Sequence, residues 1–447
     1  MPLNPLLCGL AANPALPPEL VDRLLTLALE EARADPASQF ADDLLHGLAD
    51  RADLRHDQIL ELAAHSDTMA RYLAYGGTLD AADVDPGSMP NAAVALLDER
   101  RGNLAWARFL ATHPDPQIRW KLASCPGLPQ DAVDLLAADP DEEVVKELAL
   151  WTDSPVTARL ALHPDPEVRI AAAANPSTPL EAVIVLAADP ELTLKWTLSE
   201  RTDLPQALYA RLAADPHAGV RATYASNPGI GQELIRVLAA DPELQVRRAV
   251  AKHPRIPLDL LAELVVGDRA GWNLLPRIAA ATPAELKEPA GSRHAAVRML
   301  VAQRRDLPPH LREALAVDPD ASVVRAVAPH PGLSEELLRA MVARHGVQVL
   351  AAVAANPDAS GPLLEYLTQH RPGVRRVLKE VAEHPHATGP ALLACLADRT
   401  SRPLAAAHPA LPPEAITELL ADEDHQVAEA AAGNPSLPRA VMLELMP

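Results

Sequence analysis

The sequence predicts an all-α fold in which short paired helices stack into an α-solenoid. Prolines recur about every 26 residues along most of the chain, and the segments between them carry apolar residues at helical spacing. Hydrophobic residues make up 49% of the 447 residues but aromatic residues only 3%, so the apolar side chains are mostly those of Ala, Leu and Val. This composition suits thin, closely packed helices better than a core of large aromatic side chains.

The prolines that open the longer apolar segments define the repeat. Their steps stay within two residues of 26, except for one step of 52 that spans two periods and has Gly231 at the missing position. A spacing kept over so many cycles predicts a repeat architecture rather than one large globular domain. These prolines are Pro129, Pro155, Pro179, Pro205, Pro257, Pro283 and Pro308, with Pro412 and Pro438 further along.

Each opening proline is expected to begin a first helix of about ten residues. The second position after it is often acidic, which places negative charge at the positive end of the helix dipole. The third, fourth and seventh positions are mostly apolar, as at Leu234, Ile235 and Leu238, and form the stripe of an amphipathic helix. The acidic positions are Asp131, Glu181, Glu233, Asp259, Glu285, Glu336 and Glu414.

A second, shorter helix follows an Asp-Pro junction. In residues 239–254, Asp241 is the expected N-cap and Pro242 the first helical residue, and Pro254 ends the helix by disfavouring the α conformation at His253. The periodicity does not distinguish an α-helix from a 3-10 helix here. Two such short helices cannot bury their apolar stripes alone, so neighbouring repeats must stack. The other junctions are Asp139-Pro140, Asp189-Pro190, Asp215-Pro216 and Asp318-Pro319.

The repeat "DPELQVRRAVAKHPRIPLDLLAELV" (241–265) resembles the variant leucine-rich repeat family. The resemblance extends from about residue 113 to the C-terminus and weakens near 262–296 and 357–402. It implies a right-handed superhelix that pairs one α-helix with one shorter, often 3-10, helix in each repeat. Some members of the family carry an N-terminal cysteine cluster for an iron–sulfur centre. This chain has only Cys8 there, against the four thiolates that such a centre usually needs, so we expect no cofactor.

The first 112 residues are less regular, which divides the chain into residues 1–112 and a regular solenoid at residues 113–447. Residues 13–29 form a recognisable repeat and residues 51–64 a degenerate one, whereas Gly and Pro interrupt the pattern at residues 76–90. We interpret residues 1–112 as divergent repeats or a cap, because a terminal repeat must present a polar face to water. A separate small N-terminal module is the alternative.

Composition also limits the environment and the partners. The formal net charge of −20 argues against a general nucleic-acid binder and favours a partner with a basic contact surface. Three widely spaced cysteines (Cys8, Cys125 and Cys395) fit a reducing compartment. The N-terminal segment lacks the basic residues and long apolar run of a secretion signal, and no stretch has the length of a membrane span. We therefore expect a cytoplasmic protein without a membrane association.

A cation recurs in the second helix of successive repeats. Such a row could bind carboxylates or phosphates. We favour a structural interpretation, in which each cation pairs with a nearby Asp-Pro carboxylate or a helix-terminal carbonyl, because repeat-wide recurrence is typical of structural residues. Arg119, Arg169, Arg221 and Arg247 are kept as candidate binding residues. The full row, the cation ladder, is Arg119, Lys146, Arg169, Lys195, Arg221, Arg247, Arg298, Arg325 and Arg402.

The residue after each cation varies freely between repeats, so it is not constrained by the core. Trp120, Trp196, Arg248 and Met299 are our candidate partner-binding residues at this position, because Trp, Met and Arg are favoured at interfaces. The alternative is that the two tryptophans fill local packing gaps. The complete set is Trp120, Glu147, Ile170, Trp196, Ala222, Arg248, Met299 and Ala326.

Histidines before proline raise the hypothesis of a metal site, which the spacing opposes. They lie in different repeats, and stacked helices are about 9 Å apart, whereas zinc ligands must all lie about 2 Å from one ion. We interpret them as turn residues interchangeable with Asn175, Asn227, Asn356 and Asn434. The histidines are His113, His163, His253, His330, His384 and His408.

The sequence contains no HExxH, CxxC, GxSxG or phosphate-loop motif and predicts no enzyme. We therefore expect a non-catalytic cytoplasmic scaffold that binds a protein or peptide along its extended face. Two alternatives stay open. The protein could be an accessory subunit that modulates an enzyme, or it could bind nucleic acid through the cation ladder.

Overall fold

The computed structural model describes residues 3–188, 192–266, 273–370 and 375–446. Within these ranges the secondary structure is entirely helical, which confirms the predicted fold class. The predicted Asp189-Pro190 junction lies outside the described residues. Packing divides the chain into two compact units. Unit 1 comprises residues 1–54 and 265–447, and unit 2 comprises residues 55–264. The boundary expected at residue 113 concerns the regularity of the repeat and stays a prediction.

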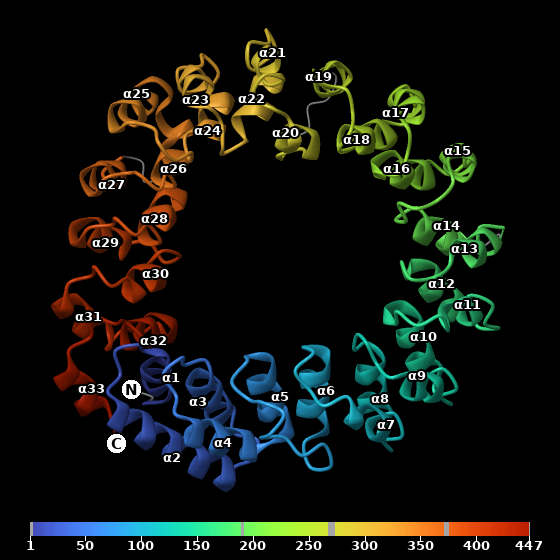
Figure 1. Cartoon of the computed structure of the whole chain (residues 1–447). Helices are drawn as coiled ribbons and strands as arrows, with labels where there is room; N and C mark the ends of the chain where they lie inside the picture. Colours follow the sequence, from blue (N-terminus) through green and yellow to red (C-terminus); the bar gives the residue numbers. More distant parts are fainter. Residues whose placement is uncertain (1–2, 189–191, 267–272, 371–374, 447) are drawn as a thin grey trace. The chain divides into compact units, whose positions relative to one another are not determined.

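Unit 2 carries most of the regular repeats of the first half of the chain (Figure 1). Its helices are α4 (His56–His65), α5 (Asp67–Tyr75), α6 (Pro90–Asp98), α7 (Ala105–Leu110), α8 (Pro116–Ala123), α9 (Gln130–Leu136), α10 (Glu142–Trp151), α11 (Thr157–Leu160), α12 (Pro166–Ala174), α13 (Leu180–Leu186), α14 (Leu192–Leu198), α15 (Gln206–Ala213), α16 (Ala218–Ser226), α17 (Gln232–Ala239) and α18 (Leu244–Ala251).

Unit 1 combines the N-terminal helices with the second half of the chain, and α19 (Leu258–Val266) crosses the boundary. Its other helices are α1 (Leu3–Ala12), α2 (Pro18–Ala34), α3 (Gln39–Ala49), α20 (Pro276–Ala280), α21 (Lys287–Ala290), α22 (Ala295–Ala302), α23 (Pro309–Ala316), α24 (Ala321–Val327), α25 (Glu335–His345), the 3-10 helix η1 (Gly346–Gln348), α26 (Leu350–Ala354), α27 (Gly361–Thr368), α28 (Arg375–Ala382), α29 (Gly389–Cys395), α30 (Arg402–Ala407), α31 (Pro413–Leu419), α32 (His425–Ala432) and α33 (Arg439–Leu445).

Most first helices begin where the proline spacing predicts, but they are shorter than the ten residues expected. After Pro155 and Pro283 the helices α11 and α21 begin only at Thr157 and Lys287 and have four residues each. Pro129, Pro179 and Pro205 are the N-cap residues of α9, α13 and α15. Gly231, at the missing position, is the N-cap of α17. Proline serves here because the N-cap position requires extended backbone, and the fixed φ of proline supplies it. The local sequence therefore indicates where these helices start.

The second helices are α-helices, unlike the 3-10 helices that the family resemblance implies. Examples are α8, α12 and α18, which have eight, nine and eight residues. Contrary to expectation, they are not the shorter helices of the pair either, because α10 and α12 have ten and nine residues whereas α9 and α13 have seven. Ala, Leu and Val in these segments allow a regular α turn, and stacking on the neighbouring repeat makes such short helices stable. In unit 2 the second helices pack directly on one another, as in α8–α10–α12 and α16–α18, and more closely than the first helices do (Figure 1).

The predicted cap of α18 is wrong by two residues. The helix begins at Leu244 with Glu243 at the N-cap, rather than at Pro242 with Asp241 as cap. The carboxylate of Asp241 instead accepts a hydrogen bond from the Glu243 N–H at 2.9 Å and pairs with Arg221 of the preceding repeat. It closes the turn before the helix, and a helix that began earlier would move this carboxylate away from Arg221.

A set of polar residues at the ends of second helices joins each repeat to the one before it. Asn175 Nδ2 donates to the carbonyl oxygens of Ala149 and Thr152 at 2.9 and 2.8 Å, at the C-terminal end of α10. These carbonyls have no partner within their own helix, so the side chain satisfies them. We call these residues the inter-repeat clamps. The others include Asn13, Arg51, Arg201, Asn227, His253, Arg304, Asn356, His384, His408 and Asn434.

Histidine replaces asparagine in the clamps, as predicted. The distance from His253 Nε2 to the Asn227 carbonyl oxygen is 2.9 Å, and that from His384 Nε2 to the Asn356 carbonyl oxygen is 2.8 Å. On the other side of the imidazole, His253 Nδ1 accepts the Arg255 N–H, as Asn175 Oδ1 accepts the Ser177 N–H. Both side chains thus combine one donor and one acceptor in the geometry that the clamp requires.

Candidate interaction surface

The variable position after each ladder cation lies at the surface of the second helices. All eight of these side chains are half-buried or exposed. The apolar residues that flank the position, such as Val246 and Val250 in α18, are fully buried. The stacking of second helices in unit 2 places the variable side chains of α8 to α18 on successive rungs of one row, which we call the second-helix face.

Trp120 and Trp151 lie on either side of Glu147 on this face. Trp120 on α8 is half-buried, whereas Trp151 at the end of α10 is 57% exposed. Burial raises the pKa of Glu147, and hydrogen bonding from the indoles of Trp151 and Trp120 partly offsets this rise. The Glu147 carboxylate therefore hydrogen-bonds to two indole groups.

Trp196 lies further along the same face, on α14. Its side chain is 44% exposed, which is high for the largest side chain in proteins. The indole covers α16, because a Cβ placed on Gly219 would lie only 3.8 Å from Trp196 Cζ2. Trp196 is thus braced on one side and open to solvent on the other, as an anchor for a partner would be.

The other two candidates occupy different surroundings. Arg248 is exposed on α18 in unit 2. Met299 is half-buried on α22, which belongs to unit 1. The second-helix face of unit 2 therefore carries Trp120, Trp196 and Arg248, whereas Met299 belongs to unit 1.

Sequence reasoning missed Trp151 because this residue lies outside the variable position. The signal was nevertheless present in "EVVKELALW" (143–151), where Trp151 follows Glu147 by four residues. Side chains four residues apart lie on the same side of an α-helix. Trp151 is therefore added to the candidate residues.

Five cations of the ladder pair with an aspartate of the next repeat, which belongs to an Asp-Pro junction in every case except Asp422. Arg119 Nε and Nη2 donate to Asp139 Oδ2 and Oδ1 at 2.7 and 3.0 Å, and its Nη1 donates to the His113 carbonyl at 2.8 Å. The pairs Arg221–Asp241 and Arg298–Asp318 repeat this bidentate geometry. Lys195 and Arg402 pair with Asp215 and Asp422 at 3.0 and 2.5 Å. For these five cations the structural interpretation is confirmed.

The remaining candidates of the ladder also contact backbone. Arg169 Nη1 donates to the carbonyl oxygens of His163 and Pro164 at 3.0 and 2.9 Å. Arg247 Nη1 donates to those of Asp241 and Pro242 at 2.7 and 2.8 Å. Each guanidinium therefore ties the start of a second helix to its own repeat. Binding of a partner by Arg119, Arg169, Arg221 and Arg247 stays a prediction. A partner would have to compete with the present carbonyl and carboxylate acceptors for the N–H groups of these side chains.

The Arg221–Asp241 pair is expected to contribute to stability across a repeat boundary. The two side chains are only 15% and 8% exposed, and Arg221 holds the pKa of Asp241 below its usual range. In a double-mutant cycle with Arg221→Ala and Asp241→Ala, we expect a coupling of about 1–3 kcal/mol in urea denaturation. Arg236→Ala on α17, an exposed position of a first helix, is the control. Additive effects of the two substitutions would contradict the expectation.

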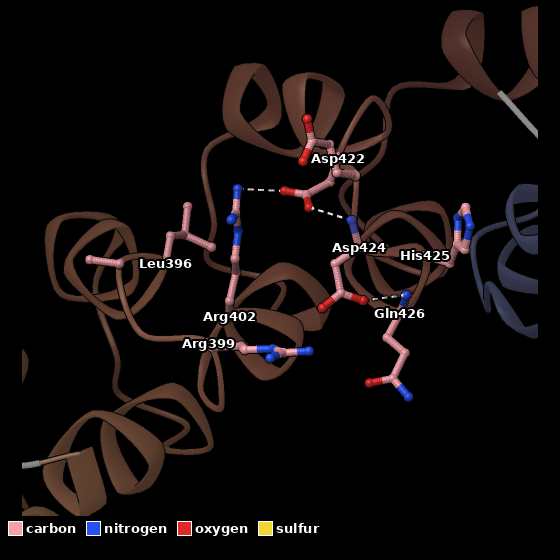
Figure 2. A pocket seen from close by; sticks show the side chains of 9 residues that line it. Leu396, Arg399, Arg402, Asp422, Asp424, His425 and Gln426 are labelled. Atoms are coloured by element: carbon pink, nitrogen blue, oxygen red, sulfur yellow. Dashed lines mark hydrogen bonds and ion pairs between the residues drawn. The ribbon is translucent and has the colours of Figure 1, made fainter.

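A surface pocket in unit 1 lies beside Arg402, one of the cations of the ladder (Figure 2). It has a volume of about 840 Å³, and acidic, basic and amide side chains line it together. Arg402 pairs with Asp422, whose other oxygen accepts the Asp424 N–H at 2.9 Å, while Asp424 accepts the Gln426 N–H at 3.1 Å (Figure 2). These carboxylates are used in closing the turn before α32, so the pocket is part of the repeat structure.

The histidines before proline are turn residues in the structure, as predicted from the sequence. In the described ranges, no group of three or more His, Cys, Asp or Glu side chains is placed to share a metal ion. His253, His384 and His408 instead serve as inter-repeat clamps. Over the same part of the chain, no helix is both long and apolar enough to cross a bilayer.

The paired helices, the inter-repeat clamps and the ion pairs between repeats define a helical-repeat solenoid protein. No family model matches the chain, and no curated protein matches it. A solved structure described as "a leucine-rich repeat variant with a novel repetitive protein structural motif" is similar at 23% identity. The match covers 55% of this chain and 86% of the other, with a TM-score of 0.30. This likeness concerns the repeat fold and supports no conclusion about function.

Proposed function

We propose that this protein is a non-catalytic scaffold of the variant leucine-rich repeat type that binds a protein or peptide on the second-helix face of unit 2. The observation that carries the proposal is the exposure of Trp151 and Trp196 on the second helices of unit 2. Exposed tryptophans on a well-braced surface are typical of interface hot spots. Stacked repeats commonly use such extended faces for binding.

The partner is proposed to present a basic segment. Glu147 stands between two indoles, and the charges of Glu143 and Lys146 also act on it. A Lys or Arg side chain could stack on the indoles while its charge meets the Glu147 carboxylate. The net charge of −20 would steer such a segment toward the protein from a distance. A cytoplasmic location is part of this proposal.

An accessory subunit that modulates an enzyme is the second candidate, because it would use the same face. Binding of nucleic acid through the cation ladder is less favoured. Arg119 already uses four of its five N–H groups in the bonds to Asp139, His113 and Pro114. Arg221 does the same with Asp241, Asp215 and Pro216. Phosphate groups would have to replace these bonds.

The proposal is tested by affinity capture from a native cell extract. The variant Trp120→Ala/Trp196→Ala/Arg248→Ala is compared with the wild-type protein at low and moderate salt. We expect the bound protein to be lost with the variant, with an affinity lowered at least about thirtyfold, because each hot-spot Trp contributes about 2 kcal/mol or more. Circular dichroism confirms that the variant still melts cooperatively.

A matched control removes apolar area from the first helices. Val185→Ala/Val237→Ala changes two side chains on α13 and α17 that are 58% and 62% exposed. A partner lost equally with both variants would contradict recognition by the second-helix face. Nucleic acid recovered with every variant and released by salt would transfer the assignment to the cation ladder. A captured enzyme whose activity changes would select the accessory subunit.

A further inference from the structure

The first helix of the chain packs against one of its last helices. In unit 1, α1 lies beside α32 and also contacts α33 (Figure 1). Residues Leu3–Ala12 and His425–Ala432 are thus neighbours in space, although more than 400 positions separate them in the sequence. We call this contact, together with Asn13 and Asn434, the terminal junction.

The terminal junction has the geometry of an ordinary boundary between repeats. Asn13 Nδ2 donates to the carbonyl oxygens of Ala432 and Asn434 at 2.9 and 2.8 Å. One repeat earlier, Asn434 Nδ2 donates to those of Ala406 and His408 at 2.7 and 2.9 Å. The N-terminal residues therefore occupy the place of the next repeat after α32. The repeat that follows the N-terminal residues is joined to them in the same way, because Arg51 Nη1 donates to the Asn13 carbonyl oxygen at 2.7 Å.

Close packing makes the two faces of the terminal junction specific for each other. A Cβ on Gly9 would overlap the carbonyl oxygen of Glu429 and lie 2.8 Å from the Ala432 Cβ. Only glycine allows α1 to approach α32 so closely. At the edge of the contact, Arg439 on α33 pairs with Glu19 on α2. Shape and charge thus both match between the N-terminal and C-terminal faces.

The terminal junction nevertheless contains a repulsive site. Burial raises the pKa of Glu429, and the charge of Asp43 on α3 raises it further. Cys8 on α1 is half-buried beside these two carboxylates. The chain does not run from one side of the terminal junction to the other. Among the described residues, side-chain packing, the Asn13 clamp and the Arg439–Glu19 ion pair hold the two sides together.

We propose that the terminal junction is an exchangeable interface through which a second copy of this chain binds head to tail. Residues 1–54 of one copy dock on α32 and α33 of another and replace the intramolecular contact. The occupant is defined by the structure, because the face of α32 already fits this segment. Such an exchange of identical elements creates no new surface and makes two junctions in a dimer. Within one chain the tether favours the closed state, so assembly requires high concentration or a weakened junction.

The charge pair at the edge allows a direct test with the full chain. Glu19→Arg places two arginines at the junction of one variant, and Arg439→Glu places two glutamates at that of the other. Each variant alone has like charges, whether it is closed or dimeric with itself. In the mixture, both junctions of a head-to-tail heterodimer regain opposite charges. We expect heterodimers to exceed the dimers of either single variant by roughly tenfold at low salt, about threefold to fivefold for each exposed pair.

Native mass spectrometry distinguishes the species, since the two variants differ in mass. The doubly substituted chain Glu19→Arg/Arg439→Glu restores the pair within one molecule and should behave as the wild type. High salt should reduce the excess of heterodimer. Monomers alone in the mixture, or dimers in statistical proportion, would overturn the proposal.

The Cys8 thiol gives a second measurement that does not depend on the ion pair. Its pKa is raised to about 11, chiefly by burial at the junction, so the thiolate is scarce while the junction is closed. Gly9→Ala favours the helix but forces α1 away from α32, and we expect it to speed alkylation of Cys8 by at least about tenfold. Gly47→Ala on α3, where a Cβ would lie 3.4 Å from the Ala11 Cβ, is the control. Equal rates in the two variants would contradict an openable junction.

Discussion

Replacement of Asn356 by leucine is expected to lower the free energy of unfolding of unit 1 by about 2–4 kcal/mol. Asn356 is fully buried, and its Nδ2 donates to the carbonyl oxygens of Ala328 and His330 at 2.5 and 2.7 Å. Its Oδ1 accepts the Asp358 N–H at 2.9 Å. Leucine has a similar volume but leaves all three backbone groups without a partner in a site that water does not reach.

Asn356→His is the matched variant. His384 joins its own repeat to the one before it by one donor and one acceptor, so histidine should satisfy two of the three backbone groups and recover part of the lost stability. Urea denaturation measures the loss, and amide hydrogen exchange in α24 and α26 locates it, because stability in a repeat protein is partly local. Equal destabilisation by His and Leu would show that packing, rather than hydrogen bonding, determines this site.

The proline spacing predicted the first helices well because their starts are local. An extended residue at the N-cap followed by an amphipathic stripe determines the helix wherever the chain goes, which is why even Gly231 is placed correctly. The interchange of Asn and His was also predictable, since both precede proline at the same turn. The cap of α18 was not predictable from the local sequence. Asp241 forms an ion pair with Arg221, and the position of Arg221 depends on the neighbouring repeat.

Some of what was missed had a signal in the sequence. The arginine clamps occur as Arg-x-Asp, at Arg51-Ala52-Asp53, Arg201-Thr202-Asp203 and Arg304-Arg305-Asp306, where the aspartate two residues later orients the guanidinium. The sequence alone does not show that these arginines replace asparagine as inter-repeat clamps, because this role depends on which carbonyl oxygens of the preceding repeat they contact. The terminal junction was less accessible still, because repeat periodicity describes neighbours along the chain and not the contact of α1 with α32.

Acidification from pH 7.5 to pH 4.5 is expected to destabilise unit 1 through His330. This residue is 1% exposed on the C-terminal side of α24. Burial, with a smaller effect from the charge of Arg305, lowers its pKa from 6.5 to about 4. Among the described residues, His330 Nδ1 has no hydrogen-bond partner, because the nearby Gly332 N–H donates to Asp358. Hydrogen bonds to the backbone carbonyls of Ala302 and Ala326 raise the pKa in part, but burial outweighs them.

The direction of the effect follows from the protons bound in each state. Between pH 6.5 and 4 the unfolded chain binds a proton at His330 and the folded chain does not, so stability falls as the pH is lowered. The full stabilisation is present above pH 6.5, and the lowered pKa corresponds to about 3 kcal/mol of it. Burial also lowers the pKa of His384, which acts on unit 1 in the same direction.

His330→Asn should remove much of this pH dependence while keeping a clamp side chain that other repeats already use. Urea midpoints of the wild type and the variant are compared from pH 7.5 to pH 4.5. Burial raises the pKa of the ion-paired Asp318 of unit 1, but hydrogen bonding to Arg298 and to the Asp320 N–H outweighs it, so the pKa lies below its ordinary value of 3.8. The stability that Asp318 contributes is lost only as the unfolded chain becomes protonated near pH 3.8, so it adds little to the change between pH 7.5 and 4.5. His310→Asn, at an exposed position of α23, is the control. Parallel pH profiles for the wild type and His330→Asn would mean that His330 becomes protonated in the folded state without cost, and that its burial does not control the acid stability of unit 1.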